Sequence, residues 1–194
     1  MKLLMTRHGE TQYNKEKKYY GRTDIELDGL GLRQARELAD KLKATTIDYA
    51  IRSDLKRTQQ TMDAIMQYHP QTKQIIEKDI DEMPFGIWEG LNADQVEARD
   101  PTTWAAWLQA PFDVTPAGAE PYRVFEKRVT TALDHYRETL PSNSTLLVVA
   151  HQGVLRTLYR YWTGDDFWSV DFKAGCYSVF ETGDGGVSLV SLND

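Results

Sequence analysis

Two histidines directly follow the two most apolar short segments of the sequence. His8 comes after the run 2–6, with Arg7 between them, and His151 comes directly after the run 145–150. Both runs have the length and the continuous apolar character of buried strands, and ligands of open α/β sheets bind at the carboxyl ends of the strands. We therefore expect the two histidines to lie close together at one sheet edge, as the centre of an active site.

Arg7 and Arg57 make phosphate the ligand that suits this edge best. The segment 48–51 reads as another strand, and it leads to Arg57 in the first turn of a helix, a position that favours an anion. A guanidinium binds phosphoryl oxygens through paired hydrogen bonds, and a histidine can act as nucleophile or proton donor. Phosphoryl transfer also needs an acid for the leaving oxygen, and Glu82 is the candidate.

The remaining histidines are assigned no function, because His69 lies at a helix end and His135 lies off the apolar face of its helix. The four histidines show no spacing typical of metal ligands, and no cysteine cluster accompanies them. We therefore expect neither a metal site nor a cofactor. The pair Trp104 and Trp107 is more typical of packing, although both, together with Tyr122, are candidates for substrate contact.

Helical patterns surround these positions. One helix is expected from Asp28, whose side chain would cap the first turn, and another from Ser53 and Asp54, which offer capping oxygens. The segment 122–140 carries apolar residues on one face and predicts a long helix packed on a sheet. Alternating strands and helices indicate an α/β fold, a three-layer sandwich with a mostly parallel central sheet.

The remaining segments complete a single domain over residues 1–194. We expect a short edge strand at 73–77 and a terminal hairpin around 183–186. Residues 92–121 open with a capping box at 92–95 and then form a compact excursion, which we expect to cover the active site like a cap. No repeat or linker composition divides the chain further.

Charge and cysteine content restrict the partners. The excess of 29 acidic over 23 basic residues gives a net charge of −6, which argues against nucleic acid or an anionic membrane as partner. The single cysteine, Cys176, cannot form an intramolecular disulfide, and its flanks at 175–180 predict a strand with a buried, inert thiol. We expect a cytoplasmic protein without a signal peptide or membrane span, acting on a small phosphate ester. The sequence does not indicate an oligomeric state.

Several motifs, taken together, resemble those of the histidine phosphatases, the family that includes cofactor-dependent phosphoglycerate mutase. The resemblance covers nearly the whole chain, and the motifs stand in the family's order and spacing. Tyr13 occupies a position where tryptophan is common, and Asp28 replaces a usual threonine. The matching segments are 7–11 with Asn14, 21–24 with Leu27, Gly31, Gln34 and Ala35, then 53–61, 82–90 and His151.

The resemblance implies a reaction through a phosphohistidine. Neutral His8 would attack phosphorus through Nε2, while a carbonyl near Gly9 holds its other ring nitrogen. Glu82 would protonate the leaving oxygen and then activate the hydrolytic water. The catalytic residues that this implies are His8, Glu82, His151, Arg7 and Arg57, the last three holding the equatorial oxygens. The implied substrate- and phosphate-binding residues are Arg7, Asn14, Gly21, Thr23, Arg57, His151 and the backbone of Gln152.

Hydrolysis is favoured over mutase activity, because the mutases carry a longer insertion with further basic residues after the acid motif. Here 90–122 holds only Arg99 as a basic residue, among several acidic ones. The segments 151–155 and 172–178 resemble the α-ribazole phosphatase branch, so α-ribazole 5′-phosphate is our first substrate. The alternatives are a broad phosphatase on sugar or acid phosphates, then the mutase. A non-catalytic binding protein ranks last, because all five catalytic residues are present.

Overall fold

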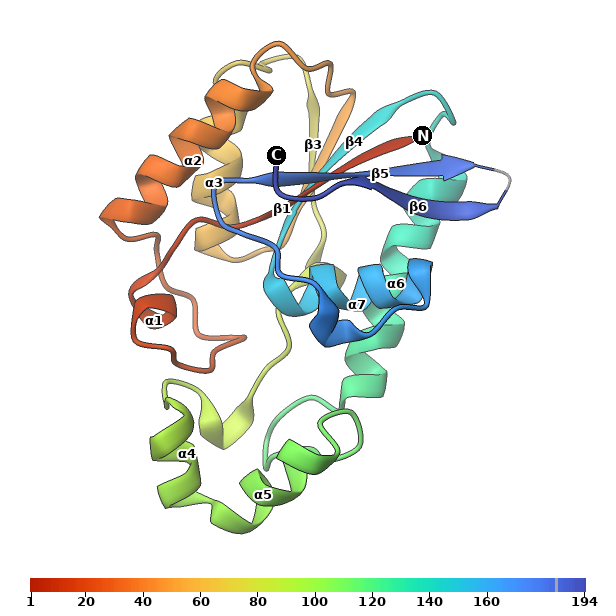
Figure 1. Cartoon of the computed structure of the whole chain (residues 1–194). Coiled ribbons are helices and arrows are strands. Elements are labelled where there is room, and N and C mark those ends of the chain that lie inside the picture. Colours follow the sequence, from red (N-terminus) through yellow and green to blue (C-terminus); the bar gives the residue numbers. More distant parts are fainter. Residues whose placement is uncertain (184) are drawn as a thin grey trace.

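One mixed sheet forms the centre of the fold (Figure 1) in the computed structural model, which describes residues 1–183 and 185–194. Its strands are β1 (Lys2–Arg7), β2 (Tyr49–Arg52), β3 (Lys73–Ile76), β4 (Thr145–Ala150), β5 (Tyr177–Gly183) and β6 (Gly186–Ser191). The order is β3–β2–β4–β1–β5–β6. The first four of these neighbours run parallel, and β5 and β6 run antiparallel to their neighbours. The predicted mostly parallel sheet and the edge strand β3 are confirmed.

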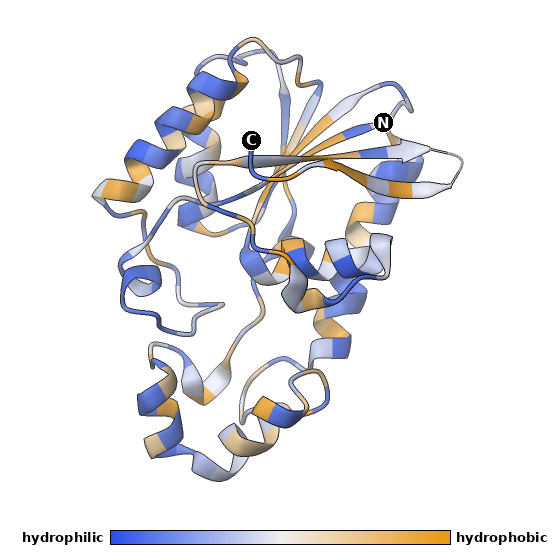
Figure 2. Ribbon diagram, viewed as in Figure 1, coloured by the Kyte–Doolittle hydropathy of each residue, from blue (hydrophilic) through white to orange (hydrophobic). Residues whose placement is uncertain are grey.

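Helices cover both faces of the sheet and make the predicted three layers. The helices are α1 (Gln12–Lys15), α2 (Gly29–Leu42), α3 (Lys56–Met66), α4 (Ala93–Arg99), α5 (Pro101–Gln109), α6 (Tyr122–Thr139) and α7 (Gln152–Thr163). Side chains of β1 alternate between the two faces, because successive residues of a strand point to opposite sides. Leu4 packs in the core under α2 and α3, whereas Leu3 and Met5 pack in the core under α6 and α7. Figure 2 shows the apolar residues concentrated along the strands.

Two of the three predicted helix caps form as expected. The Asp28 side chain accepts a hydrogen bond from Gly31 N–H at 2.8 Å, and Asn92 forms the predicted capping box at the start of α4. The prediction that Ser53 and Asp54 cap α3 is wrong, because the residue before that helix is Leu55 and no side chain caps it. The Ser53 hydroxyl has a different partner, described below.

The prediction for Cys176 also needs correction. Strand β5 begins at Tyr177, so Cys176 precedes the strand, and it is half-buried rather than buried. Its sulfur lies 3.8 Å from Lys41 Nζ. The turn of the terminal hairpin includes residue 184, which lies outside the described residues. Across the described ranges 1–183 and 185–194, no helix is both long and apolar enough to cross a membrane.

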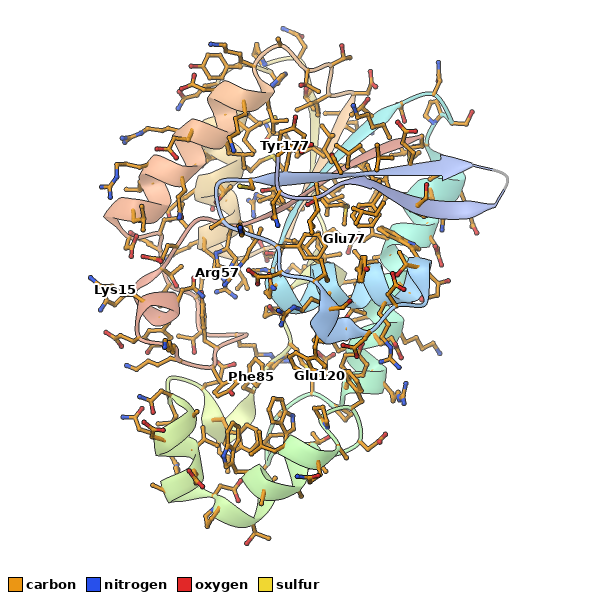
Figure 3. All side chains as sticks on the ribbon, in the orientation of Figure 1. Lys15, Arg57, Glu77, Phe85, Glu120 and Tyr177 are labelled. Carbon is orange, nitrogen blue, oxygen red and sulfur yellow. The ribbon has the colours of Figure 1, made fainter. Side chains whose placement is uncertain are left out.

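The segment 92–121 lies beyond the carboxyl edge of the sheet and includes α4 and α5 (Figure 1). An aromatic cluster holds it against the rest of the chain: Trp88, Val96 and Trp104 are buried there, and Tyr19 and Trp107 pack against them. The rings of Trp104 and Trp107 stack at 5.5 Å, which agrees with the packing role expected for this pair. Figure 3 labels Phe85 and Glu120 where this segment meets the body of the protein.

Candidate active site

His8 and His151 meet at the carboxyl edge of the sheet, as the sequence predicted. Strands β1 and β4 are paired up to Arg7 and Ala150, so the residues that follow them are neighbours, and the two imidazole rings lie 5.2 Å apart. The His8 backbone N–H donates to the Ala150 carbonyl at 3.0 Å. Parallel pairing without a register shift therefore brings together two side chains that are 143 positions apart in the sequence.

Among the described residues, only one of the two ring nitrogens of His8 has a hydrogen-bond partner. Its Nδ1 lies 2.7 Å from the Gly9 carbonyl oxygen, which can only accept, so the proton must be on Nδ1. Burial, followed by the charges of Arg57 and Arg7, lowers the pKa of His8 well below its usual value. A neutral imidazole protonated on Nδ1 presents the lone pair of Nε2, which is what a nucleophile needs.

His151 is held by partners on both ring nitrogens. Arg57 Nε donates to its Nδ1 at 3.2 Å, so the proton is on Nε2, which donates to Ser53 Oγ at 2.7 Å. Burial and then the charge of Arg57 lower the pKa of His151 well below its usual value. The resemblance implies that His151 donates a hydrogen bond to a phosphoryl oxygen. For Nδ1 to do so, it would have to lose the hydrogen bond from Arg57 Nε and become protonated. The role of His151 as a direct phosphate ligand stays a prediction.

Sequence reasoning missed the part that Ser53 plays. Its hydroxyl is fully buried, accepts from His151 and lies 2.8 Å from Thr58 Oγ, and Thr58 in turn donates to the Leu55 carbonyl at 2.7 Å. This chain of hydroxyls selects the Nε2-protonated form of His151. The only available signal was the position of Ser53 at the end of β2, next to the strand that carries His151.

Arg57 is completely buried, yet no carboxylate among the described residues forms an ion pair with it. Three of its five N–H groups are used, on His151 Nδ1, on the Thr23 carbonyl at 2.9 Å and on the Gly21 carbonyl at 3.0 Å. Two N–H groups of Arg57 therefore remain for an anion, and Glu82, Asp24 and Glu89 act on its charge only from beyond ion-pair distance. Arg7 adds a second charge, and its buried Nε has no hydrogen-bond partner among the residues that the structure describes.

Glu82 comes from the segment before Met83 and lies beside the first turn of α7, where it lines the same cavity as Arg7. Its two carboxyl oxygens accept from the N–H groups of Met83 at 3.1 Å and Gly153 at 3.0 Å. Burial raises the pKa of Glu82, although both hydrogen bonds and the two arginines oppose that shift. A carboxyl with a raised pKa near two arginines can hold the proton that a leaving oxygen requires.

The other predicted binding residues are Gly21, Thr23, Asn14 and Gln152, and they differ in how they could reach a phosphate. Gly21 and Thr23 give their backbone N–H groups to Glu89 and their carbonyls to Arg57, so they contact the predicted phosphate site through Arg57. Asn14 Oδ1 accepts from the backbone N–H and hydroxyl of Thr11 and from Tyr20, which leaves the amide N–H groups to act as donors. Gln152 is the first residue of α7, where backbone N–H groups have no partner within the helix.

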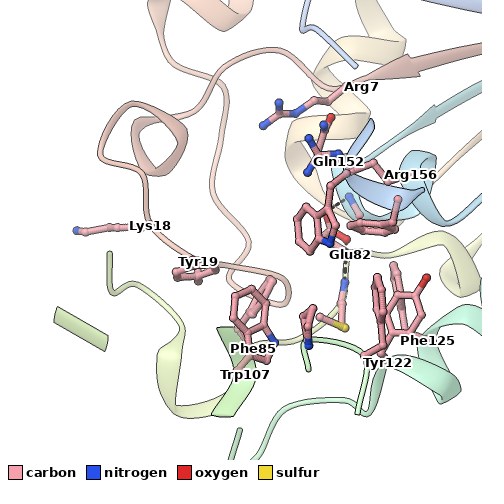
Figure 4. A pocket seen from close by; sticks show the side chains of 16 residues that line it. Arg7, Lys18, Tyr19, Glu82, Phe85, Trp107, Tyr122, Phe125, Gln152 and Arg156 are labelled. Atoms are coloured by element: carbon pink, nitrogen blue, oxygen red, sulfur yellow. Dashed lines mark hydrogen bonds between the residues drawn. The ribbon is translucent and has the colours of Figure 1, made fainter. Parts of the chain in front are cut away.

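A cavity of about 330 Å³ opens beside Arg7 and Glu82 (Figure 4). Trp107 and Tyr122, predicted as candidate substrate contacts, line it, whereas Trp104 does not. Its aromatic lining consists of Tyr19, Phe85, Trp107, Phe112, Tyr122, Phe125, Phe167 and Trp168. Sequence reasoning missed most of these residues, because they come from four distant segments that only the fold brings together.

Two further cations line the cavity, and each already has a carboxylate partner. Lys18 Nζ lies 2.6 Å from Glu16, and Arg156 lies 3.6 Å from Asp171. Among the described residues that line the cavity, Arg7 is therefore the one cation without a carboxylate partner for a second phosphate group. Among the residues that the structure describes, no cluster of three or more His, Cys, Asp or Glu could hold a metal ion.

Comparisons with known proteins agree with this geometry. The sequence model of the Histidine phosphatase superfamily (branch 1) matches residues 3–194. The chain is 30% identical to the adenosylcobalamin/alpha-ribazole phosphatase of Escherichia coli, covering 100% of this chain and 96% of that protein. It is also 30% identical to phosphoserine phosphatase 1 of Hydrogenobacter thermophilus, covering 100% and 92%. The crystal structure of the alpha-ribazole phosphatase from Shigella flexneri superimposes with a TM-score of 0.90 at 28% identity, covering 100% and 96%.

Proposed function

Because this chain belongs to the histidine phosphatase superfamily and is a phosphatase, we propose that it hydrolyses a small phosphomonoester through a phosphohistidine on His8. The observation that carries the proposal is the pairing of a neutral His8, with Nε2 free, and two arginines that have no carboxylate partner among the described residues. The arginines attract the phosphate and keep the nucleophile unprotonated at the same time.

The reaction proceeds in two transfers. In the first, Nε2 of His8 forms a bond to phosphorus while the ester P–O bond breaks, and Glu82 gives its proton to the departing oxygen. In the second, a water molecule gives a proton to Glu82 and attacks phosphorus, the P–N bond breaks, and inorganic phosphate leaves. Arg7 and Arg57 stabilise the charge on the equatorial oxygens in both steps.

The cavity favours a substrate whose alcohol part carries an aromatic ring, and we place α-ribazole 5′-phosphate first. The benzimidazole base of that nucleoside is flat and apolar, so it can pack against the aromatic wall of the cavity. The charged amino and carboxyl groups of phosphoserine would pack less favourably there. The relatives named as α-ribazole phosphatases support the same choice. A broad phosphatase is the second candidate. The pairing of Lys18 and Arg156 with carboxylates argues against a mutase, which must bind a bisphosphate.

A substrate panel tests the proposal. Values of kcat/KM are compared for α-ribazole 5′-phosphate, phosphoserine, 3-phosphoglycerate and p-nitrophenyl phosphate, with labelling of the enzyme by ³²P-substrate. We expect the first to be preferred by more than about tenfold, and His8→Ala to lose both turnover and label. His135→Ala, an exposed histidine, is the matched control. A smaller preference would demote the enzyme to a broad phosphatase, and full labelling of His8→Ala would refute the nucleophile.

We also propose a cellular setting for this enzyme. A cytoplasmic enzyme without nucleic-acid partners fits the net charge of −6 and a single cysteine that has no disulfide partner. The segment 92–121 is proposed to act as a cap, because it contributes Trp107, Pro111 and Phe112 to the cavity wall.

A further inference from the structure

Glu89 has no role in the reaction described above, yet its carboxylate accepts five hydrogen bonds. Its carboxylate accepts from the backbone N–H groups of Gly21 at 2.7 Å, Arg22 at 3.2 Å, Thr23 at 3.1 Å and Phe85 at 3.0 Å, and also from the Thr23 hydroxyl. Burial opposes ionisation, but the bonds from Phe85 and Thr23 outweigh it and lower the pKa of Glu89. The group is therefore a carboxylate at neutral pH, with donors gathered around both oxygens.

The loop Gly21–Thr23, whose N–H groups bond to Glu89, also binds Arg57 through its carbonyl groups. The carbonyl oxygens of Gly21 and Thr23 accept from Nη2 and Nη1 of Arg57, and their N–H groups donate to Glu89. A Cβ on Gly21 would lie 1.9 Å from the Met83 carbonyl oxygen, so the loop is also pressed against the segment that carries Glu82. The loop is therefore clamped between a carboxylate and a guanidinium that do not pair with each other.

We propose that Glu89 is a positioning residue that fixes the Arg57 guanidinium through the Gly21–Thr23 loop. The proposal rests on the proposed role of Arg57 in binding the phosphoryl group. A carboxylate in direct contact with Arg57 would orient it equally well but would offset its charge. Placing the carboxylate behind a loop keeps the orientation and leaves the charge for the phosphate, which needs both at the transition state.

A double-mutant cycle separates this role from a structural one. Glu89→Gln is made in the wild-type and in the Arg57→Ala background, and kcat, KM and the inhibition constant of orthovanadate are measured with p-nitrophenyl phosphate. An amide can accept through only one atom, and its NH₂ would face backbone donors, so the loop must shift. Glu97→Gln, an exposed glutamate on α4, is the matched control.

In the wild-type background, we expect Glu89→Gln to lower kcat/KM by about tenfold or more and to raise the inhibition constant of orthovanadate by a similar factor. In the Arg57→Ala background the same substitution should change kcat/KM and the inhibition constant by less than about twofold, because the guanidinium that Glu89 positions is absent. Any loss of melting temperature should be similar in both backgrounds. Equal fold-losses in the two backgrounds, or no loss in the wild type, would overturn the proposal.

Thr23→Val covers the case in which Glu89→Gln does not fold. It removes only the hydroxyl bond to Glu89, and we expect a smaller loss that again depends on Arg57. If Arg57→Ala itself leaves kcat/KM and vanadate inhibition unchanged, the proposed phosphate role of Arg57 fails, and the role of Glu89 fails with it. If Arg57→Ala is impaired but the Glu89 effect persists unchanged, only the positioning role fails.

Discussion

Gly153 is the position where the smallest substitution should have the largest chemical effect. It is the second residue of α7, and its N–H donates to the carboxyl of Glu82. A Cβ at this position would lie 2.4 Å from Oε1 and 3.1 Å from Cδ of Glu82. The change Gly153→Ala therefore cannot be accommodated unless the carboxyl of Glu82 moves by about 1 Å to reach ordinary contact distance.

The displacement should cost activity and leave the fold intact. A general acid contributes about 10²- to 10⁴-fold, and a misplacement of about 1 Å can cost about 10²-fold, so we expect kcat for an alkyl phosphate to fall about 10²-fold. With p-nitrophenyl phosphate the leaving oxygen needs no proton, and the loss should stay below about threefold. Because alanine also favours the helix by up to about 1 kcal/mol, the melting temperature should change by less than about 4 °C.

The assay is the ratio of kcat values on the two substrates, measured for Gly153→Ala and for a control glycine. Gly29→Ala is suitable, since Gly29 also lies in the first turn of a helix and its Cβ would meet only Arg33 Nη1, at 3.9 Å. Equal losses on both substrates for Gly153→Ala would show that the change disturbs phosphate binding rather than the acid. Unchanged activity on the alkyl phosphate would refute the assignment of Glu82.

Three further predictions concern the same site. Glu82→Gln should lower kcat strongly for alkyl phosphates and less for p-nitrophenyl phosphate; equal losses would count against the acid role. Ser53→Ala leaves the buried Nε2–H of His151 without an acceptor, so urea titration should show about 1–3 kcal/mol less stability, with Ser142→Ala, at an exposed serine, as control. The lowered pKa values of His8 and His151 mean that the unfolded chain binds more protons below about pH 6.5. Stability should therefore fall as pH drops below that value, by up to about 1.4 kcal/mol per pH unit for each histidine. The raised pKa of Glu82 acts in the opposite direction above its ordinary value of 4.5, so Glu82→Gln should steepen the fall; a pH-independent stability would contradict the neutral histidines.

The strands and the meeting of the two histidines at the sheet edge could be predicted because their signals are local. Continuous apolar runs predict β1 and β4, and the polar residues directly after them, His8 and His151, must then share an edge. Asp28 and Asn92 likewise signal helix starts through side chains that reach only three residues along the chain. In each case the partner lies close in sequence or is fixed by strand pairing.

Ser53 and Glu89 could not be assigned in this way, because their partners are distant in sequence and are partly backbone atoms. A serine before a helix is typical of a cap, and nothing in residues 53–58 indicates that its hydroxyl reaches His151, 98 positions away. Glu89 bonds to backbone N–H groups of residues 21–23, and a backbone donor carries no residue-type signal. The cavity wall was missed for the same reason, since aromatic residues indicate burial but not which ones face the same space.

The charges at the proposed site could allow one acidic protein to hold a phosphate and a general acid together. Without a ligand, Arg7 and Arg57 lower the pKa of Glu82 and partly offset the effect of burial. A bound dianionic phosphoryl group would compensate the two guanidinium charges and add negative charge beside the carboxyl, and both effects raise the pKa of Glu82 further. Glu82 is therefore most strongly protonated when substrate is present, and it loses that advantage when phosphate leaves. In the proposed mechanism, substrate binding therefore favours uptake of a proton from water by Glu82, and Glu82 then gives that proton to the leaving oxygen. A carboxyl with a fixed low pKa would be ionised at neutral pH and would have no proton to give.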